Sequence, residues 1–220
     1  MAGMLEAMRP AISRLWNGDG ETKSVTTGTL EQIAAALSLG GGSKSGQAVT
    51  VTTALSVTTV LCCARVRAEG LAQVPCRVFQ RTPDGGRREA TELPLYWLLY
   101  RKPNDWQTAF EFREQIGFHL ALCGNAYVVK VTGSDGKLIE LLPYEPGSVT
   151  VTRTSDFNIT YKLTVLGGAQ VEVPAANMWH IRGASWNGYN GMAAISMARN
   201  AIGLALAAEE FGSELFANGA

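Results

Sequence analysis

PLYWLLYRKPNDWQTAFEFREQIGFHLALCGNAYVV, residues Pro94–Val129, is the stretch that decides the fold of this 220-residue chain. Pro94 suits the first position of a helix, where its missing N–H costs nothing. Pro103 then ends this helix, because a proline disfavours helical backbone in the residue before it. Thr108 and Glu111 form a capping box, in which each side chain accepts a hydrogen bond from a backbone N–H. The stretch therefore predicts two helices separated by a turn.

The end of the same stretch predicts a helix stop and a strand. Gly124 lies where a helix C-terminus favours positive φ, and residues Ala126–Val131 are typical of a strand. The polar residues of the whole stretch have uses in caps and turns, and few of them could take part in catalysis. We interpret this part of the chain as a scaffold.

The composition narrows the classes of protein. Hydrophobic residues make up 46% and charged residues 17%, which is typical of a globular chain with one sizeable core. The 19 basic and 19 acidic residues leave no net charge, so any contact with DNA must be local or geometric. No secretory signal opens the chain and no apolar run could cross a bilayer, so we expect a soluble protein without a membrane partner.

The residues that bind metals and cofactors lack the usual spacing. The four cysteines, Cys62, Cys63, Cys76 and Cys123, fit free thiols in a reducing cytosol. Lys44 follows Ser43 rather than glycine, so the glycine-rich run around it does not fit a phosphate loop. We therefore predict no metal and no cofactor.

The first half of the chain is predicted to be helical with one hairpin. An amphipathic helix is expected over residues 4–16 and a second, short helix over 30–39, and the composition of the Gly/Ser-rich residues 40–46 predicts a flexible linker. The stripe of the first helix is formed by Leu5, Met8, Ile12 and Leu15 or Trp16. Residues 49–70 are ambiguous between strand and helix. A helix over 53–69 is favoured by the stripe Val57, Leu61, Ala64, Ala68 and Leu71 and by a cap at Thr52 or Thr53. A strand over 76–81 and a turn over 83–86 follow.

The second half is predicted to be antiparallel β structure followed by a long helix. Short runs separated by turns favour a meander or a small open barrel. They span 127–131, 137–142, 148–153, 158–165, 170–173 and 178–181. A helix from Met192 towards Ala217 is apolar nearly all round, which is typical of a helix that is buried or lies between partners. The predicted fold class is α+β, with a β-meander or open barrel flanked by helices.

The sequence contains few residues that are candidates for catalysis. His119 and His180 are the two histidines, and both are interpreted as packing residues. Cys123 lies one helical turn from His119, so a thiol nucleophile with a histidine base is an alternative. Nothing in the sequence supplies an orienting acid or an oxyanion hole, and we predict no catalytic residue.

Surface residues give the only positive signal of function. Exposed aromatic residues in loops are commoner at interfaces than on monomers. On this basis, and on that of the apolar final helix, the interface candidates are Trp106, Trp186, Tyr189, Phe211 and Leu215. A hairpin tip carries Arg81, Arg87 and Arg88, which are candidates for contact with phosphate.

A series of motifs, in order from about residue 47 to 220, resembles the portal proteins of tailed bacteriophages of the lambdoid siphophage type. The motifs are TAL (53–55), CCARVRAEGLAQVPCRVFQR (62–81), ELPLYWLLYRKPNDWQTAFEF (92–112), GNAYVV (124–129), LLPYEPGSVTV (141–151), HIRG (180–183), NGYNG (187–191) and ARNAIGLALAAEEFGSELFANGA (198–220). Within them, a PN-x-x-QT core is formed by Pro103, Asn104, Gln107 and Thr108.

The resemblance implies a structural subunit of a ring, usually of twelve copies, at the unique vertex of the capsid. Double-stranded DNA would pass through this ring during packaging and ejection. The implied partners are other copies of the chain, the major capsid protein, scaffold, terminase and the head–tail adaptor. The implied location is the virion, with assembly in the host cytoplasm.

The resemblance also implies a domain organisation. Residues 47–220 would form a wing-like α+β domain, and residues 1–46 an N-terminal helical arm and linker outside the resemblance. Family members continue into stem, clip and crown parts, so we expect this chain to end before them. The alternatives are a non-assembling capsid- or scaffold-binding fragment of a degraded prophage, and a small thiol enzyme that uses Cys123 and His119.

Overall fold

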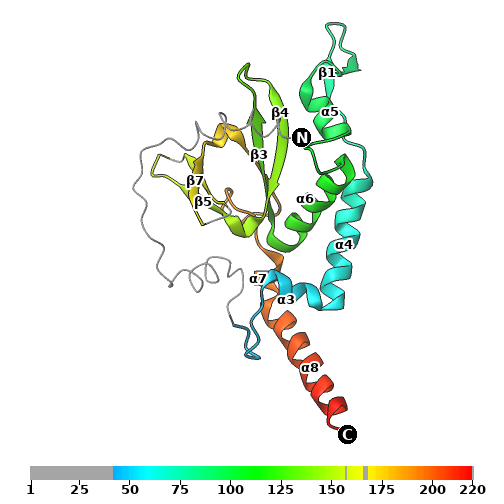
Figure 1. Cartoon of the computed structure of the whole chain (residues 1–220), viewed down its shortest axis with the longest axis vertical. Helices are drawn as coiled ribbons and strands as arrows, with labels where there is room; N and C mark the ends of the chain where they lie inside the picture. The colour runs from blue at the N-terminus through cyan, green and yellow to red at the C-terminus, as the bar shows by residue number, and fades with distance from the viewer. Residues whose placement is uncertain (1–41, 157, 166–167, 220) are drawn as a thin grey trace, which may run out of the picture.

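The computed structural model describes residues 42–156, 158–165 and 168–219, and the helices predicted over 4–16 and 30–39 lie outside them. The described part is α+β, as predicted, with helices packed beside two small antiparallel sheets (Figure 1). Its helices are α3 (Val51–Ser56), α4 (Thr58–Gln73), α5 (Pro94–Tyr100), α6 (Ala109–Cys123), α7 (Ala194–Met197) and α8 (Arg199–Ala217). Its strands are β1 (Phe79–Arg81), β2 (Arg87–Glu89), β3 (Asn125–Thr132), β4 (Leu138–Tyr144), β5 (Val149–Arg153), β6 (Ile159–Thr164), β7 (Gln170–Val173) and β8 (Met178–Arg182).

The stretch Pro94–Val129 folds as the sequence predicts. Pro94 is the first residue of α5, which ends at Tyr100. Thr108 caps α6, and the capping box with Glu111 is complete in both directions. Gly124 ends α6 with φ 68°, and β3 follows at once. Each of these features rests on contacts between residues close in sequence, which is why the sequence alone predicts them.

The turn between α5 and α6 is held by Asn104, a polar side chain that is 3% exposed. Its Nδ2 donates to the Leu141 carbonyl (3.0 Å) and to Gln107 Oε1 (2.9 Å). Its Oδ1 accepts from the Gln107 N–H at 2.9 Å. A buried amide that keeps its hydrogen bonds is stabilising. Asn104 therefore fixes the start of α6 against strand β4.

The predicted helix over 53–69 is real but differs at its ends and in its buried face. Thr50 rather than Thr52 or Thr53 is the cap, and the helix is divided into α3 and α4 at Val57. Leu61 and Leu71, predicted on the buried stripe, are 41% and 42% exposed. The buried residues of α4 are its alanines, because α4 packs closely on α6. An added Cβ on Gly117 of α6 would lie 2.6 Å from Ala68 Cα.

The strands form two three-stranded sheets and one hairpin. Strand order is β4-β3-β8 in the first sheet and β5-β6-β7 in the second, and all pairs are antiparallel. The β1–β2 hairpin stands apart at the top of Figure 1. The last strand, β8, returns to pair with β3, so the first sheet is not a simple meander. Such pairing between distant strands cannot be read from local sequence.

Strand β3 lies at the centre of the molecule and is buried on both faces. Ala126 and Val128 pack with Phe112 and Ile116 of α6. Tyr127 points to the other side and packs with the second sheet. The two faces alternate because successive side chains of a strand point in opposite directions. The fold is thus a helical layer, the β3 sheet and the second sheet, stacked in that order.

The C-terminal helix differs from the prediction. It is interrupted at Ala198, between α7 and α8, and it begins at Ala194 rather than at Met192. Only Ile202 and Gly203 of α8 are buried among the described residues. In Figure 1, α8 projects from the body of the molecule towards the C-terminus. The prediction of a buried helix was therefore wrong for most of α8 within the described residues, although its apolar residues lie on every side.

Residues 42–46, predicted as a flexible linker, pack on α8. Gly42 and Ala48 form a bridge, and the Lys44 N–H donates to Asn200 Oδ1 at 3.2 Å. Ser43 is 8% exposed and lies against Gly203, where an added Cβ would be 2.2 Å from Ser43 Oγ. The small residues that suggested flexibility instead allow close packing.

Candidate intersubunit surface

The Cys123–His119 pair has the wrong electrostatics for a thiol nucleophile. Burial raises the pKa of the Cys123 thiol to about 11 and lowers the pKa of His119 to about 4. His119 Nδ1 is buried and has no hydrogen-bond partner among the described residues. A reactive cysteine needs a lowered pKa and a base within reach. At neutral pH both groups are neutral and the thiol is not activated.

The two histidines make the fold sensitive to acid. Burial lowers the pKa of His119 and of His180 to about 4, from an ordinary value of 6.5. The unfolded chain therefore binds more protons than the folded chain between pH 6.5 and 4, so stability falls as pH falls through this window. We expect His119 to account for a loss of about 1–2 kcal/mol between pH 7 and pH 5, and half-buried His180 for less.

Urea unfolding at pH 7 and at pH 5 measures this effect, and His119→Leu should remove the His119 share. Hydrogen bonds lower the pKa of Glu89 and of Glu111 from 4.5, so these two carboxylates keep their charge between pH 7 and pH 5. Burial raises the pKa of Glu140, so the comparison with His119→Leu is what isolates the histidine. Equal free energies of unfolding at the two pH values would contradict the assignment.

His180 belongs to a network that holds the loop between β8 and α7. Its Nε2 lies 3.0 Å from Asn125 Oδ1, and its ring stacks on Tyr127 at 4.4 Å. The same Asn125 oxygen accepts from the Gly191 N–H at 2.7 Å, and Asn125 Nδ2 donates back to the Gly191 carbonyl at 3.0 Å. The start of β3 and the end of the loop are thereby joined.

The loop itself presents Trp186 to solvent. Asn187 Oδ1 accepts from the N–H groups of Tyr189 (3.1 Å) and Asn190 (2.8 Å), which makes a tight turn. Trp186 is 93% exposed. Tyr189 is half-buried, with the Arg153 guanidinium 5.8 Å from its ring centre. An exposed tryptophan on a loop with internal hydrogen bonds is typical of a contact residue.

The other interface candidates lie elsewhere on the molecule. Trp106, 65% exposed, precedes the N-terminus of α6. The Trp186 loop is tied to the opposite end of α6, through the Gly183 N–H that donates to the Gly124 carbonyl at 2.8 Å. The 15 residues of α6 span about 22 Å, so the two tryptophans lie near opposite ends of this helix. Phe211 and Leu215, 69% and 47% exposed, are on α8.

The arginines of the hairpin divide into two kinds. Arg81 and Arg87 are exposed and directly opposite each other in the β1–β2 register, on one face. Arg88 instead donates to Glu92 Oε1 at 2.7 Å and to Gln80 Oε1 at 3.0 Å. Like charges placed opposite each other repel, and an anion between them would relieve that repulsion.

Two apolar features extend beyond the residues that sequence reasoning singled out, of which Phe211 and Leu215 were already interface candidates. On α8, the residues Ala201, Leu204, Ala208, Phe211 and Leu215, here called the α8 seam, are all exposed. Their signal in the sequence is a 3-4-3-4 spacing, which the apolar residues on the rest of the helix obscured. Around α5 and the hairpin, further exposed side chains are Val74, Phe79, Leu93, Trp97 and Tyr100. In Figure 1 these two regions lie at opposite ends of the molecule.

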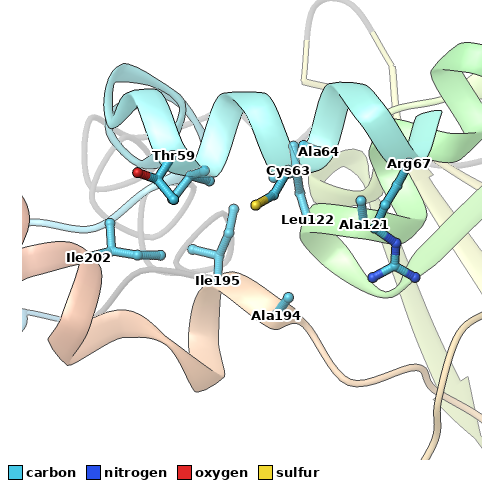
Figure 2. Close-up of a pocket in the computed structure, with 10 residues that line it drawn as sticks. Thr59, Cys63, Ala64, Arg67, Ala121, Leu122, Ala194, Ile195 and Ile202 are labelled. Carbon is cyan, nitrogen blue, oxygen red and sulfur yellow. The ribbon is translucent and has the colours of Figure 1, made fainter. Parts of the chain in front are cut away.

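A cavity beside α4 does not add a reactive centre. It has a volume of about 260 Å³ and lies between α4, the end of α6 and the α7–α8 region (Figure 2). Its lining is mostly apolar, with Thr59, Cys63 and Arg67 on α4 as the polar exceptions. Among the described residues no group of His, Cys, Asp and Glu is placed to hold a metal ion. No helix in the described ranges is both long and apolar enough to cross a membrane.

A family model and a sequence relative point to the same protein family. The family model described as phage portal protein matches residues 58–220. The portal protein of Enterobacteria phage HK97 is 30% identical over 168 residues, which cover 76% of this chain and 39% of that protein. Protein BeeE of Escherichia coli (strain K12) is 34% identical over 121 residues, which cover 55% of this chain and 76% of that protein.

A solved structure shares the fold. A chain from the neck of an empty GTA particle, computed with C6 symmetry, matches with a TM-score of 0.63 and 22% identity. The match covers 92% of this chain and 50% of that chain. The chain thus spans about two fifths of the HK97 protein and half of the solved chain that it matches.

Proposed function

This chain belongs to the phage portal protein family, and on that premise we propose that it is a structural subunit of a portal ring at one vertex of a phage head. The observation that carries the proposal beyond the family is the position of exposed apolar side chains at separate places on the molecule. A ring is built by head-to-tail contacts, in which one surface of each subunit meets a different surface of the next. A subunit with a single apolar patch would form pairs instead.

The proposed contacts between subunits involve Trp186 and Tyr189 on one surface and Trp106 with the side chains around α5 on another. Trp186 has the largest exposed fraction of them, and its loop is held in shape by Asn125 and Asn187. A preformed loop loses little conformational freedom on binding, which favours association. Phe211 and Leu215, the two interface candidates on α8, belong to the α8 seam.

The ring would serve as a conduit for genome packaging and ejection and as the docking site for the terminase and the head–tail adaptor. Other partners would be the major capsid protein and scaffold, in the host cytoplasm during assembly and in the virion afterwards. Residues 47–220 would be the wing-like part and residues 1–46 an arm. The role is structural and needs no catalysis, which the inactive state of Cys123 supports.

Double-stranded DNA is the proposed cargo, and the hairpin is the proposed place of phosphate contact. Arg81 and Arg87 are the candidates for it, because they face the same side and are exposed. Arg88 was predicted with them, but its pairing with Glu92 makes it a weaker candidate. With zero net charge, such contact would be local rather than a general attraction.

The ring proposal is tested by mass in solution. Light scattering over a range of concentrations should show a closed oligomer of this chain that dissociates on dilution. Trp186→Ser should weaken each contact by about 30-fold or more, since a buried interface tryptophan contributes about 2 kcal/mol or more. The variant should fold normally, because Trp186 makes little contact within its own chain.

Val66→Ser is the matched control, since Val66 is an apolar residue of α4 that is 70% exposed and is not among the proposed contact residues. It should assemble like the unmodified chain. A chain that remains monomeric at every concentration would refute ring formation and would fit the capsid- or scaffold-binding fragment.

A further inference from the structure

We propose that Trp186 of one subunit inserts into the cavity beside α4 of the next subunit in the ring. The cavity lies between α4, the end of α6 and the α7–α8 region, and its volume is about 260 Å³. Within its own chain Trp186 is 93% exposed, so the cavity that it fills belongs to another copy. This contact rests on the proposed ring, and it gives Trp186 a receiving site on the neighbouring subunit.

Trp186 has the exposure and the support of an inserting side chain. No other described tryptophan is more than 65% exposed. Asn187 Oδ1 accepts hydrogen bonds from two backbone N–H groups of the loop, and Asn125 ties the loop to β3 through two more. The loop therefore presents the indole in a fixed shape and loses little conformational freedom on binding. An aromatic side chain held out in this way is typical of an interface anchor that fills a pocket on its partner.

The volume of the cavity fits an indole. An apolar cavity of about 150 Å³ binds one benzene molecule. An indole has nine ring atoms where benzene has six, so it needs about 225 Å³ by the same proportion. The cavity beside α4 is slightly larger than this, at about 260 Å³. One tryptophan side chain would therefore fill most of it.

The lining of the cavity matches the polarity of an indole. Buried Leu122 and Ile195 contribute apolar surface, and the Cys63 sulfur points from α4 into the space between the helices in Figure 2. Thr59 and Arg67 lie towards opposite ends of the lining. A buried tryptophan needs an acceptor for its N–H, which the Thr59 hydroxyl offers. The face of the indole attracts a cation, which the Arg67 guanidinium offers.

Arg67 is free to make this contact. It is exposed on α4, and within the described part of the chain no hydrogen bond or ion pair engages its guanidinium. The other arginine nearby on α4, Arg65, is instead paired with Glu69. A cation at the edge of an apolar cavity thus distinguishes an aromatic occupant from an aliphatic one, since only the aromatic ring attracts it.

The positions of the two surfaces suit a ring. The Trp186 loop leaves β8 in the first sheet, whereas the cavity lies in the helical layer. The inserting and the receiving surfaces are thus different parts of one subunit, which is the head-to-tail arrangement that builds rings. Val74 follows Arg67 by seven residues, about two turns, so it continues the same side of α4 towards α5. The receiving surface therefore extends from the cavity to the side chains around α5 that are already among the proposed contacts.

A double-variant comparison tests the insertion. Cys63→Phe places a ring in the cavity and should weaken assembly by about 30-fold, as Trp186→Ser should. Both changes remove the same contact, so the double variant should lose little more than either single variant. The losses of two independent contacts would instead multiply to about 900-fold. Light scattering over a range of concentrations measures the three losses.

Matched controls come from the neighbouring residues of α4. Cys62 is exposed like Cys63 but does not line the cavity, so Cys62→Phe should assemble like the unmodified chain. Arg67→Gln, a milder change, should weaken assembly by about fivefold through loss of the cation–π contact. Arg65→Gln should change it by less than twofold. Circular dichroism and urea unfolding show whether each variant is folded.

Mixing the two single variants tests the direction of the contact. The Trp186→Ser chain keeps its cavity and the Cys63→Phe chain keeps its tryptophan, so the proposed contact remains possible only between unlike chains. An equimolar mixture should form a 1:1 pair that grows no further, at concentrations at which each variant alone is monomeric.

The outcomes separate the insertion from the ring itself. If Cys63→Phe assembles like the unmodified chain, or if the two losses multiply in the double variant, Trp186 meets another surface and the insertion is wrong while the ring stands. An unmodified chain that stays monomeric at every concentration would overturn both.

Discussion

Replacement of Gly124 by alanine is expected to lower the free energy of unfolding by about 2–5 kcal/mol. Gly124 ends α6 with φ 68°, a left-handed conformation that costs other residues about 1–2 kcal/mol. The added Cβ would also lie 2.1 Å from the Met192 carbonyl oxygen, so the backbone that crosses it must move. Overpacking of this kind costs about 1–3 kcal/mol more. Urea unfolding followed by circular dichroism measures the change.

Gly136 is the matched control for this prediction. It has φ 74° in the turn between β3 and β4, but an added Cβ would meet nothing within 4 Å. Gly136→Ala should therefore show the conformational cost alone, about 1 kcal/mol. If both substitutions cost the same, the crossing of residues 191–192 over Gly124 would contribute nothing to stability.

The crossing has a consequence for the proposed contact surface. An added Cβ on Gly191 would lie 1.8 Å from the Gly124 carbonyl oxygen, so the two glycines fit each other at this point. The loop that carries Trp186 leaves β8 and returns through this contact. A change at Gly124 should thus disturb the loop as well as the end of α6, although Trp186 itself makes little contact with the body.

Phe112→Ala is expected to cost about 3–5 kcal/mol, the usual range for the loss of a buried phenylalanine. Phe112 is a residue of α6 and is 1% exposed. It packs against α5 and the β3 sheet, in one cluster with Leu98, Val128 and Leu141. These neighbours come from three different elements, so they cannot collapse together into the space that is left. The midpoint of urea unfolding should fall markedly.

Phe110→Ala tests the same chemical change on the same helix. Phe110 is 41% exposed and lies two residues away, on another face of α6. Its replacement should cost less than about 1 kcal/mol, since most of its apolar surface is already in water. A loss for Phe110 as large as that for Phe112 would mean that α6 does not pack on the sheet through the face described.

Much of the local structure could be predicted because its causes lie within a few residues. The capping box of Thr108 with Glu111, the start of α5 at Pro94 and the positive φ of Gly124 each rest on backbone chemistry at the end of one helix. The turn residues between strands are of the same kind. The turn beside Trp186 is also local, because the Asn187 side chain accepts hydrogen bonds from the N–H groups of Tyr189 and Asn190.

Apart from helix boundaries, the errors concern which surfaces of the molecule pack against each other. Leu61 and Leu71 were expected to be buried, but α4 meets α6 through Ala68, because Gly117 allows the two helices to come close together. The Gly/Ser-rich residues from Gly42 were expected to be a free linker, but Ser43 fits against Gly203. In both places small side chains permit close approach, and composition alone assigns them to flexible segments.

The sequence by itself determined the kinds of element, their main boundaries, the family and the lack of an evident catalytic motif. Only the tertiary structure decided the pairing of β8 with β3, the inactive state of Cys123 and the division of α8 into a packed face and an open seam. The physical reason is the distance along the sequence over which the relevant interactions act. Caps, turns and helix periods depend on neighbours within about four residues, whereas pairing, burial and pKa depend on the side chains that distant segments bring together.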